Sequence, residues 1–193
     1  MLLFTAIFST IATVEDRRAG FLQGVLVAPV PRWAIVLGQA LGGTTLAVGQ
    51  GVLFLVLAPF LGVHVTFTGI VLAILVMVPV ALALTSIGLV IAWRMESTQG
   101  FHAIMNLILI PIWLLSGAFF PAAGAPGVLR VLMTANPLTY GMAALRRCLY
   151  WHDPTLAGPV PPLGLSLAVT LAFAGVAFLA ATRVAAGATG RRG

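Results

Sequence analysis

Long apolar runs separated by short polar connectors extend over almost the whole chain. Four of these runs reach the ~20 residues that a helix needs to cross the hydrocarbon core of a bilayer, and they occupy residues 34–61, 69–93, 101–120 and 162–183. Residues 1–14 form a shorter run, which predicts a partial span. Because backbone groups in lipid must be hydrogen-bonded within their own segment, the runs predict helices. We therefore expect an all-α polytopic membrane protein, a single transmembrane domain over 1–193 with about five hydrophobic helices, the first of them partial.

The composition favours a membrane protein over a soluble domain. Of the 193 residues, 61% are hydrophobic and only 7% are charged, whereas soluble domains carry about 25% charged residues. The single cysteine excludes an internal disulfide and a cysteine-rich metal site. His64 and His102 are too far apart in the sequence for the usual spacing of metal ligands. We therefore predict no metal site.

The distribution of arginine predicts the orientation of the spans. All ten basic residues are Arg, and if every run spans, seven lie on the side of connectors 15–33, 94–100 and 184–193. Cytoplasmic connectors usually carry the excess of basic residues. The side with seven arginines is therefore predicted to be cytoplasmic, in a multi-pass protein of the plasma (inner) membrane. The formal net charge of +6 then reflects topology and contact with membrane lipid, and it does not indicate a nucleic-acid partner.

The loop at residues 121–161 is predicted to be external, and it contains a helix-start signal. Asn136 is followed by Pro137, which is the pattern of an N-cap with proline at the first helical position. Apolar residues then recur at helical spacing. This pattern predicts an amphipathic helix that lies at the outer interface or re-enters the membrane edge. Aromatic residues of the loop suit the headgroup level, namely Tyr140, Tyr150 and Trp151.

The segment EDRRAGFLQGVLVAPVPRW, residues 15–33, interrupts the apolar runs and holds five of the chain's fourteen charged residues. Its apolar residues share one face at helical spacing, and two prolines end any helix there. One interpretation is an interfacial helix with arginines that extend to the headgroups. The other is a docking element that offers an apolar ridge and a charged edge to a cytoplasmic partner. Both need the same amphipathicity, so the residues alone leave the choice open.

Catalytic motifs are scarce in the sequence. A phosphate-binding P-loop needs a lysine, and the chain has none. Cys148, His152 and Asp153 could form a nucleophile cluster, but nothing in the sequence supplies an oxyanion hole. A membrane-embedded enzyme built on this cluster is therefore kept only as an alternative.

Polar and aromatic residues within the apolar runs allow two interpretations. Polar groups at membrane depth most often form hydrogen bonds between helices, but they also line substrate routes. Four residues of the 101–120 run are candidates for such a route: Asn106, Trp113, Ser116 and Phe119. Gly38 and Gly42 form a small-xxx-small pair that would permit close approach of a neighbouring helix.

Three blocks in the chain resemble ABC type-2 transporter permeases. GFLQGVLVAPVPRWAIVLGQ is similar to the cytosolic coupling loop of that family, and FHAIMNLILIPIWLLSGAFFP is similar to its fifth helix. NPLTYGMAALRR resembles the motif that precedes the last helix, and it places Asn136, Pro137, Tyr140 and Arg146 in an external loop motif. The resemblance is nearest to the drug- and polysaccharide-export branch, including daunorubicin-resistance permeases.

The resemblance implies that a separate partner subunit hydrolyses the ATP. Such permeases have six helices, form dimers, and bind a separate ATP-hydrolysing subunit at the coupling loop. We therefore expect a second permease chain as partner, in a homodimer. ATP and magnesium would then be held by the partner, and this chain would bind no cofactor directly. The residues that would contact the ATPase are Glu15, Arg18, Gly20, Phe21, Leu22, Gln23, Leu26, Pro29 and Arg32.

The chain departs from the family pattern in two ways. Residues 1–14 correspond to the end of the family's second helix, so we expect the first transmembrane helix to be missing. Gln23 replaces a usual Glu, Arg18 stands where an acid is frequent, and Pro31 replaces Ser. The sequence therefore predicts the permease subunit of an ABC exporter for a hydrophobic or amphiphilic substrate (a drug, lipid or glycan), with a truncated, non-transporting scaffold that pairs with a full-length permease as the alternative.

Overall fold

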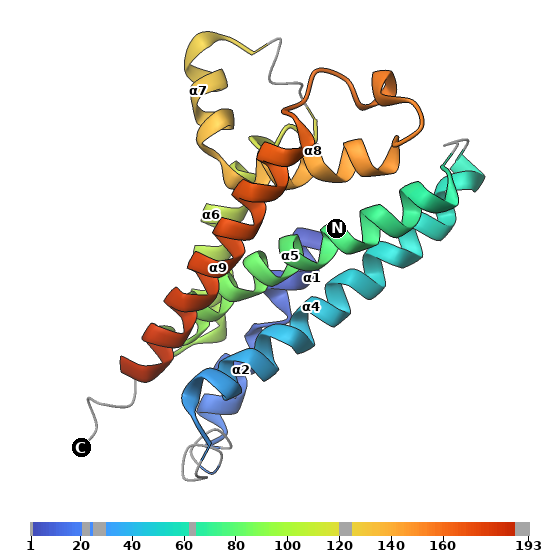
Figure 1. Ribbon diagram of the computed structural model, residues 1–193. Helices are drawn as coiled ribbons and strands as arrows, with labels where there is room; N and C mark the ends of the chain where they lie inside the picture. Colours follow the sequence, from blue (N-terminus) through green and yellow to red (C-terminus); the bar gives the residue numbers. More distant parts are fainter. Residues whose placement is uncertain (1, 21–23, 25–29, 62–64, 120–124, 188–193) are drawn as a thin grey trace.

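The computed structural model of the protein describes residues 2–20, 24, 30–61, 65–119 and 125–187. Over these residues all regular structure is helical, which confirms the predicted fold class of an all-α polytopic membrane protein (Figure 1). The α-helices in chain order are α1 (Leu2–Phe8), α2 (Ile11–Arg18), α4 (Arg32–Leu57), α5 (Phe67–Ala92), α6 (Thr98–Leu114), α7 (Gly127–Ala135), α8 (Pro137–Leu149) and α9 (Leu163–Gly187), with short 3-10 helices at Ala58–Leu61 and Pro154–Ala157.

Among the described residues, three helices are long and apolar enough to cross a bilayer. They are Arg32–Phe60, Phe67–Ala92 and Leu163–Gly187, with 29, 26 and 25 residues. At ~1.5 Å of rise per residue, each exceeds the ~30 Å hydrocarbon core. The apolar run at residues 101–120 forms α6, which begins at Thr98 and has only 17 residues, or about 26 Å of helix. Its helix ends at Leu114, short of the predicted limit at residue 120.

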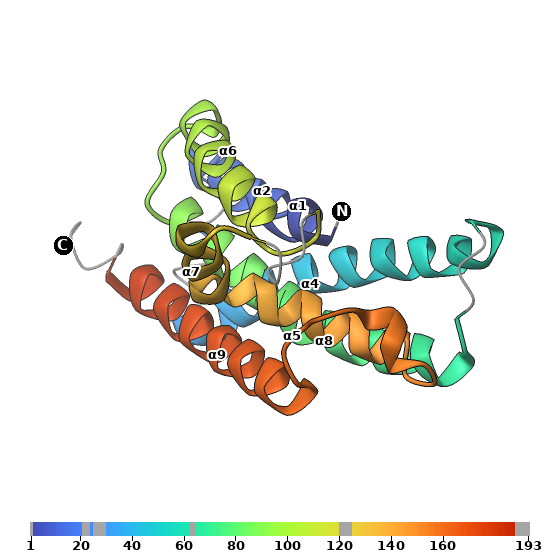
Figure 2. The same cartoon turned by 90° about the horizontal axis from the view of Figure 1, so that it is seen from above.

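Helix α5 lies at the centre of the bundle. It contacts α1, α4, α8 and α9, and Figure 2 shows it between α4 and α9. Thr85 and Ser86 on α5 are fully buried, as is Leu89 one turn later. The helix continues through Pro79. Because neighbouring helices cover it on several sides, an apolar sequence all round the helix is what burial requires.

The first hydrophobic run is not one continuous helix. It is broken between α1 and α2 at Ser9 and Thr10, whose hydroxyls donate to the carbonyls of Ala6 (2.8 Å) and Ile7 (2.7 Å). Such bonds from Ser and Thr to the preceding turn compete with the regular helix ladder. The second helix then ends at Arg18, so residues 15–18 of the charged segment are helical.

The two hydroxyls at this break pack against glycines on two other helices. A Cβ added at Gly43 of α4 would lie 2.4 Å from Ser9 Oγ, and one added at Gly88 of α5 would lie 2.7 Å from Thr10 Oγ1. Among the residues that the structure describes, no such contact exists at Gly38 or Gly42, where a Cβ would meet nothing within 4 Å. The close helix approach within this chain is therefore made at Gly43, one residue from the pair that the sequence pattern indicated.

The connectors divide between two ends of the bundle. At one end lie the end of α2, the start of α4, the α5–α6 connection and the end of α9 (Figure 1). We name it the Arg17 end. At the other end lie α7, α8 and the α4–α5 connection, and we name it the Arg146 end.

Candidate functional site

Part of the charged segment of residues 15–33 is described, and its first residues, on α2, and its last residues, at the start of α4, lie at the Arg17 end. Glu15 and Arg18 on α2 are exposed. The chain then leaves the helix through Gly20 with a φ of 77°, a left-handed conformation that a residue without Cβ adopts at little cost. Five of the predicted ATPase-contacting residues lie outside the described residues: Phe21, Leu22, Gln23, Leu26 and Pro29.

The segment is described again from Val30. Pro31 is extended and precedes α4, and Arg32 is the first residue of that helix. Arg32 and Trp33 are exposed, so the start of α4 presents a cation and an indole ring at the surface. An arginine and a tryptophan at the end of a spanning helix suit the interface between headgroups and hydrocarbon.

Arg17 ties α2 to the end of α5. Its Nη1 donates to the carbonyl of Trp93 at 2.6 Å and, at longer range, to those of Ala92 (3.3 Å) and Met95 (3.4 Å). The guanidinium carbon lies 5.8 Å from the centroid of the Trp93 ring, within the range of a cation–π interaction. The last carbonyls of a helix have no partner within it and carry partial negative charge. Arg17 therefore caps the C-terminal end of α5.

The four candidate pathway residues lie on or just after α6, and the structure brings three of them together. The Trp113 ring packs edge-on against Phe119 (4.6 Å between centroids) and against Phe4 of α1 (5.3 Å). Ser116 is buried and its hydroxyl donates to the Trp113 carbonyl at 2.6 Å. Asn106 is exposed on α6, seven residues or about two turns before Trp113.

An apolar pocket lies beside this group. It is lined mainly by aliphatic side chains of α5, α6 and the start of α8 together with Phe173 of α9; its lining residues are Ile7, Leu84, Ile87, Ile91, Met105, Ile108, Leu109, Ile112, Asn136, Pro137, Leu138 and Phe173. None of the four candidate pathway residues lines this pocket. Sequence reasoning did not indicate it, because it is formed by helix faces that meet only in the folded bundle.

The motif of Asn136, Pro137, Tyr140 and Arg146 attaches α8 to the end of α6. As the sequence predicts, α8 begins at Pro137 with Asn136 as its N-cap, and the side-chain oxygen of Asn136 accepts from the Leu138 amide at 3.0 Å. Its Nδ2 donates in turn to the carbonyl of Ile112 on α6 at 2.8 Å. Thr139 makes a similar link, since its hydroxyl donates to the carbonyls of Met133 (2.7 Å) and Leu115 (3.2 Å).

Tyr140 and the paired arginines complete the attachments of α8. The Tyr140 hydroxyl donates to the carbonyl of Thr134 on α7 at 3.0 Å. Arg146 Nη2 donates to the carbonyls of Gly117 (3.1 Å) and Ala118 (3.3 Å), just beyond α6. Arg147 reaches the opposite way, with Nε and Nη2 donating to the carbonyls of Pro161 (2.7 Å) and Val160 (2.8 Å) just before α9. Arg146 therefore joins α8 to the residues after α6, and Arg147 joins α8 to the residues before α9.

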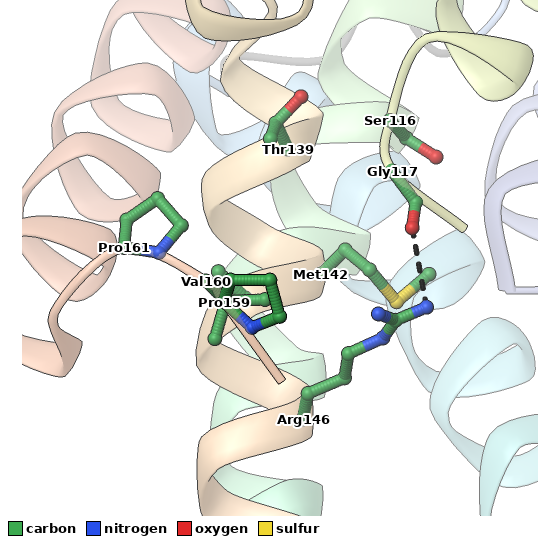
Figure 3. Close-up of a pocket in the computed structure, with 9 residues that line it drawn as sticks. Ser116, Gly117, Thr139, Met142, Arg146, Pro159, Val160 and Pro161 are labelled. Carbon is green, nitrogen blue, oxygen red and sulfur yellow. Dashed lines mark hydrogen bonds between the residues drawn. The ribbon is translucent and has the colours of Figure 1, made fainter. Parts of the chain in front are cut away.

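A pocket at the Arg146 end lies between these attachments (Figure 3). Its walls come from the end of α6, one face of α8 and the stretch before α9; its lining residues are Ser116, Gly117, Thr139, Met142, Ala143, Arg146, Pro159, Val160 and Pro161. Two of the predicted residues, Ser116 and Arg146, thus meet in one pocket, although they were assigned to different groups. Thr139 is a third polar member, which the sequence pattern did not single out.

The geometry does not assemble the cysteine cluster into a catalytic site. The Cys148 side chain is buried in the core, and burial raises the pKa of its thiol. A raised pKa leaves less of the nucleophilic thiolate near neutral pH. The Asp153 carboxylate instead accepts hydrogen bonds from Thr155, and His152 is exposed.

Comparisons with known proteins identify relatives among transport permeases. The family model of ABC-2 type transporter proteins matches residues 1–150. The chain is 26% identical over 162 residues to a protein of Cyanophora paradoxa named as the transport permease ycf38, covering 81% of this chain and 56% of that protein. It is also 26% identical over 179 residues to nodulation protein J of Rhizobium meliloti (strain 1021), covering 93% of this chain and 65% of that protein.

A third relative is named as a drug transporter. Over 151 residues the chain is 26% identical to a protein of Escherichia coli (strain K12) named as the multidrug ABC transporter permease YbhR. The match covers 78% of this chain and 40% of that protein. The chain thus spans about half the length of the curated relatives it matches. Together with the three apolar spans, these relatives indicate a multi-pass membrane protein.

Proposed function

Because the chain belongs to the ABC-2 type transporter family, we propose that it is a membrane-spanning permease subunit of an ATP-binding-cassette exporter in the plasma membrane. The ATP would be hydrolysed by a separate cytoplasmic subunit, which binds at the segment of residues 15–33. This chain would supply no ATPase site of its own and would pair with a second permease chain, identical to it in a homodimer.

The single observation that carries the coupling proposal is the attachment of Arg17. Helix α2 carries the first residues of the charged segment. Its Arg17 donates hydrogen bonds to three carbonyls at and just after the end of α5. Since α5 contacts α1, α4, α8 and α9, a displacement of the segment would reach the central helix of the bundle directly. Glu15 and Arg18 on the same helix remain exposed and available to a partner.

The proposed substrate is hydrophobic or amphiphilic and leaves from the cytoplasmic side or the inner leaflet. The aliphatic pocket between α5 and α6 supports this class, because it offers mainly apolar side chains and only one amide, Asn136. The name of one relative, a multidrug permease, is compatible with a drug as the substrate.

Proteoliposomes that contain this chain and a candidate ABC ATPase from the same genome would test the proposal. We expect ATP-driven, vanadate-sensitive movement of a fluorescent amphiphile such as Hoechst 33342. Movement that appears only after a longer permease is added would support the alternative of a non-transporting scaffold. Association with no ATPase at all would contradict both the coupling and the transport proposals.

A further inference from the structure

The pocket at the Arg146 end combines one cation with an apolar wall. Arg146, Ser116 and Thr139 are its polar side chains. The remaining side chains are apolar, those of Met142, Ala143, Pro159, Val160 and Pro161. Figure 3 shows the Arg146 side chain turned toward Gly117, with Met142 beside it and the two prolines on the other wall.

The charge of Arg146 has no counter-ion within the described part of the chain. The protein has only four acidic residues, Glu15, Asp16, Glu96 and Asp153. The first two are on α2, and Glu96 follows α5 at the Arg17 end. Asp153 is at the Arg146 end, but its carboxylate is engaged by Thr155. A half-buried guanidinium that meets only carbonyl dipoles is stabilised further by an anion, because a charge near apolar surroundings is costly without an ionic partner.

The guanidinium also keeps donors for such an anion. Both of its described hydrogen bonds use Nη2, whereas Nε and Nη1 have no partner among the described residues. A guanidinium presents five N–H groups in a planar fork, and this fork matches the oxygens of a phosphate or a carboxylate. The fork is held in place by the two carbonyl bonds, so little side-chain freedom would be lost on binding.

We propose that this pocket binds the phosphate or carboxylate headgroup of an anionic amphiphile. The head would contact Arg146, and the first part of the apolar chain would pack along Met142 and the prolines. The location suits such a ligand, because α9 begins at Leu163, two residues after Pro161, and runs on as a spanning helix. The pocket therefore lies at the end of a span, where lipid headgroups are. This inference needs neither the ATPase nor transport, and it can stand or fall apart from the proposed function.

Chemical footprinting of the wild-type protein tests the proposal without any variant. The purified chain is placed in nanodiscs of phosphatidylcholine, with or without phosphatidylglycerol, and treated with phenylglyoxal, which modifies arginine. Modification at each arginine is then read by peptide mass spectrometry. We expect phosphatidylglycerol to slow the modification of Arg146 by about tenfold, as for a charge-assisted pair of hydrogen bonds. Arg130, which is exposed on α7, should change little.

A pair of neighbouring variants separates ligand binding from structural support. Arg146→Gln and Arg147→Gln each remove one half-buried arginine and two bonds to carbonyls, but Arg147 does not line the pocket. In native mass spectrometry, R146Q should lose its preference for phosphatidylglycerol over phosphatidylcholine, and R147Q should keep it. If R146Q retains phosphatidylglycerol as well as the wild type does, the proposal is wrong.

The source of the anion is decided by a second arm. Octyl phosphate, added to phosphatidylcholine nanodiscs, tests a soluble amphiphile such as a transported substrate. Protection of Arg146 by phosphatidylglycerol assigns the site to membrane lipid, and protection by octyl phosphate alone assigns it to a soluble ligand. If neither compound slows modification of Arg146 relative to Arg130, the pocket does not bind anionic amphiphiles and the proposal is wrong.

Discussion

Arg17 and Trp93, 76 residues apart in the sequence, are joined by a 2.6 Å hydrogen bond from the guanidinium to the Trp93 carbonyl and by packing of the guanidinium over the Trp93 ring. Trp93 itself is only 3% exposed. The bond places a positive charge at the negative end of α5, where the helix dipole favours it. The contact therefore stabilises the end of α5, and in the proposed transport cycle it would transmit movement of α2 to α5.

Replacement of Arg17 by Gln should weaken the contact between α2 and the end of α5. Hydrogen bonds to a charged group contribute about 2 kcal/mol, so we expect R17Q to lower the thermal unfolding midpoint of the detergent-purified protein. In proteoliposomes with the ATPase, transport per ATP hydrolysed should fall, while co-purification of the ATPase stays near the wild-type level. Arg94→Gln, at an exposed site of the same end, is the matched control. Equal effects of R94Q and R17Q would show that stability and transport depend on positive charge at this end of the protein and not on the Arg17 contact.

Asn136 should be among the positions of the α8 motif at which a substitution lowers stability most. Asn136→Ala removes both the cap of α8 and the bond to the Ile112 carbonyl. Loss of a cap alone costs about 1 kcal/mol, and the unpaired carbonyl adds about 1 kcal/mol or more. Ser97→Ala removes only the exposed cap of α6. Chemical unfolding should therefore show a cost for N136A of about twice that of S97A, and similar costs would contradict the link between α8 and α6.

Two adjacent glycines should respond in opposite ways to the same substitution. Gly43→Ala places a Cβ 2.4 Å from Ser9 Oγ and 2.6 Å from Thr85 Cγ2, and overpacking of this kind typically costs about 1–3 kcal/mol. Gly42→Ala meets no described residue within 4 Å, and alanine favours the helix by about 1 kcal/mol. Thermal unfolding should show G43A less stable and G42A equal to or more stable than the wild type. A destabilised G42A would indicate a contact outside this chain.

Cys148 should react slowly with thiol reagents in the folded protein. Its side chain is buried and its thiol pKa is raised by that burial, so both access and the thiolate fraction are low. We expect N-ethylmaleimide labelling at pH 7.5 to be at least about tenfold faster after denaturation in SDS. Labelling should also accelerate as the pH rises toward the raised pKa. Cys148→Ser should leave transport unchanged, and a loss of transport would revive the enzyme alternative.

Structural features that are set by the local sequence of a single segment could be predicted. The three long spans follow from runs of apolar residues, and the start of α8 follows from Asn136 and Pro137. Each rests on hydropathy or on local backbone chemistry, and both can be read over a few residues. The family followed from the three motif blocks together, which span most of the chain.

Contacts between distant helices could not be predicted. The sequence pattern indicated Gly42 as the site of close helix contact, but the structure makes that contact at Gly43. Consecutive residues of a helix point in directions about 100° apart, so the two glycines face different neighbours. Arg17 finds the end of α5 across 76 residues, and Arg146 finds Gly117 across 29. No periodicity in the sequence specifies which helix face meets which neighbour, so the pocket at the Arg146 end was also not foreseen.

The central claim, that the segment of residues 15–33 is where this permease binds its ATPase, is tested most directly by co-purification. The full chain is co-expressed with a candidate ABC ATPase from the same genome, and two deletions of equal length are compared: residues 20–29 within the charged segment and residues 126–135 at the Arg146 end. Size-exclusion profiles establish that each variant is folded. The account predicts that the ATPase is recovered with the wild type and with the 126–135 deletion, and is lost with the 20–29 deletion. Undiminished recovery of the ATPase with the 20–29 deletion would contradict it.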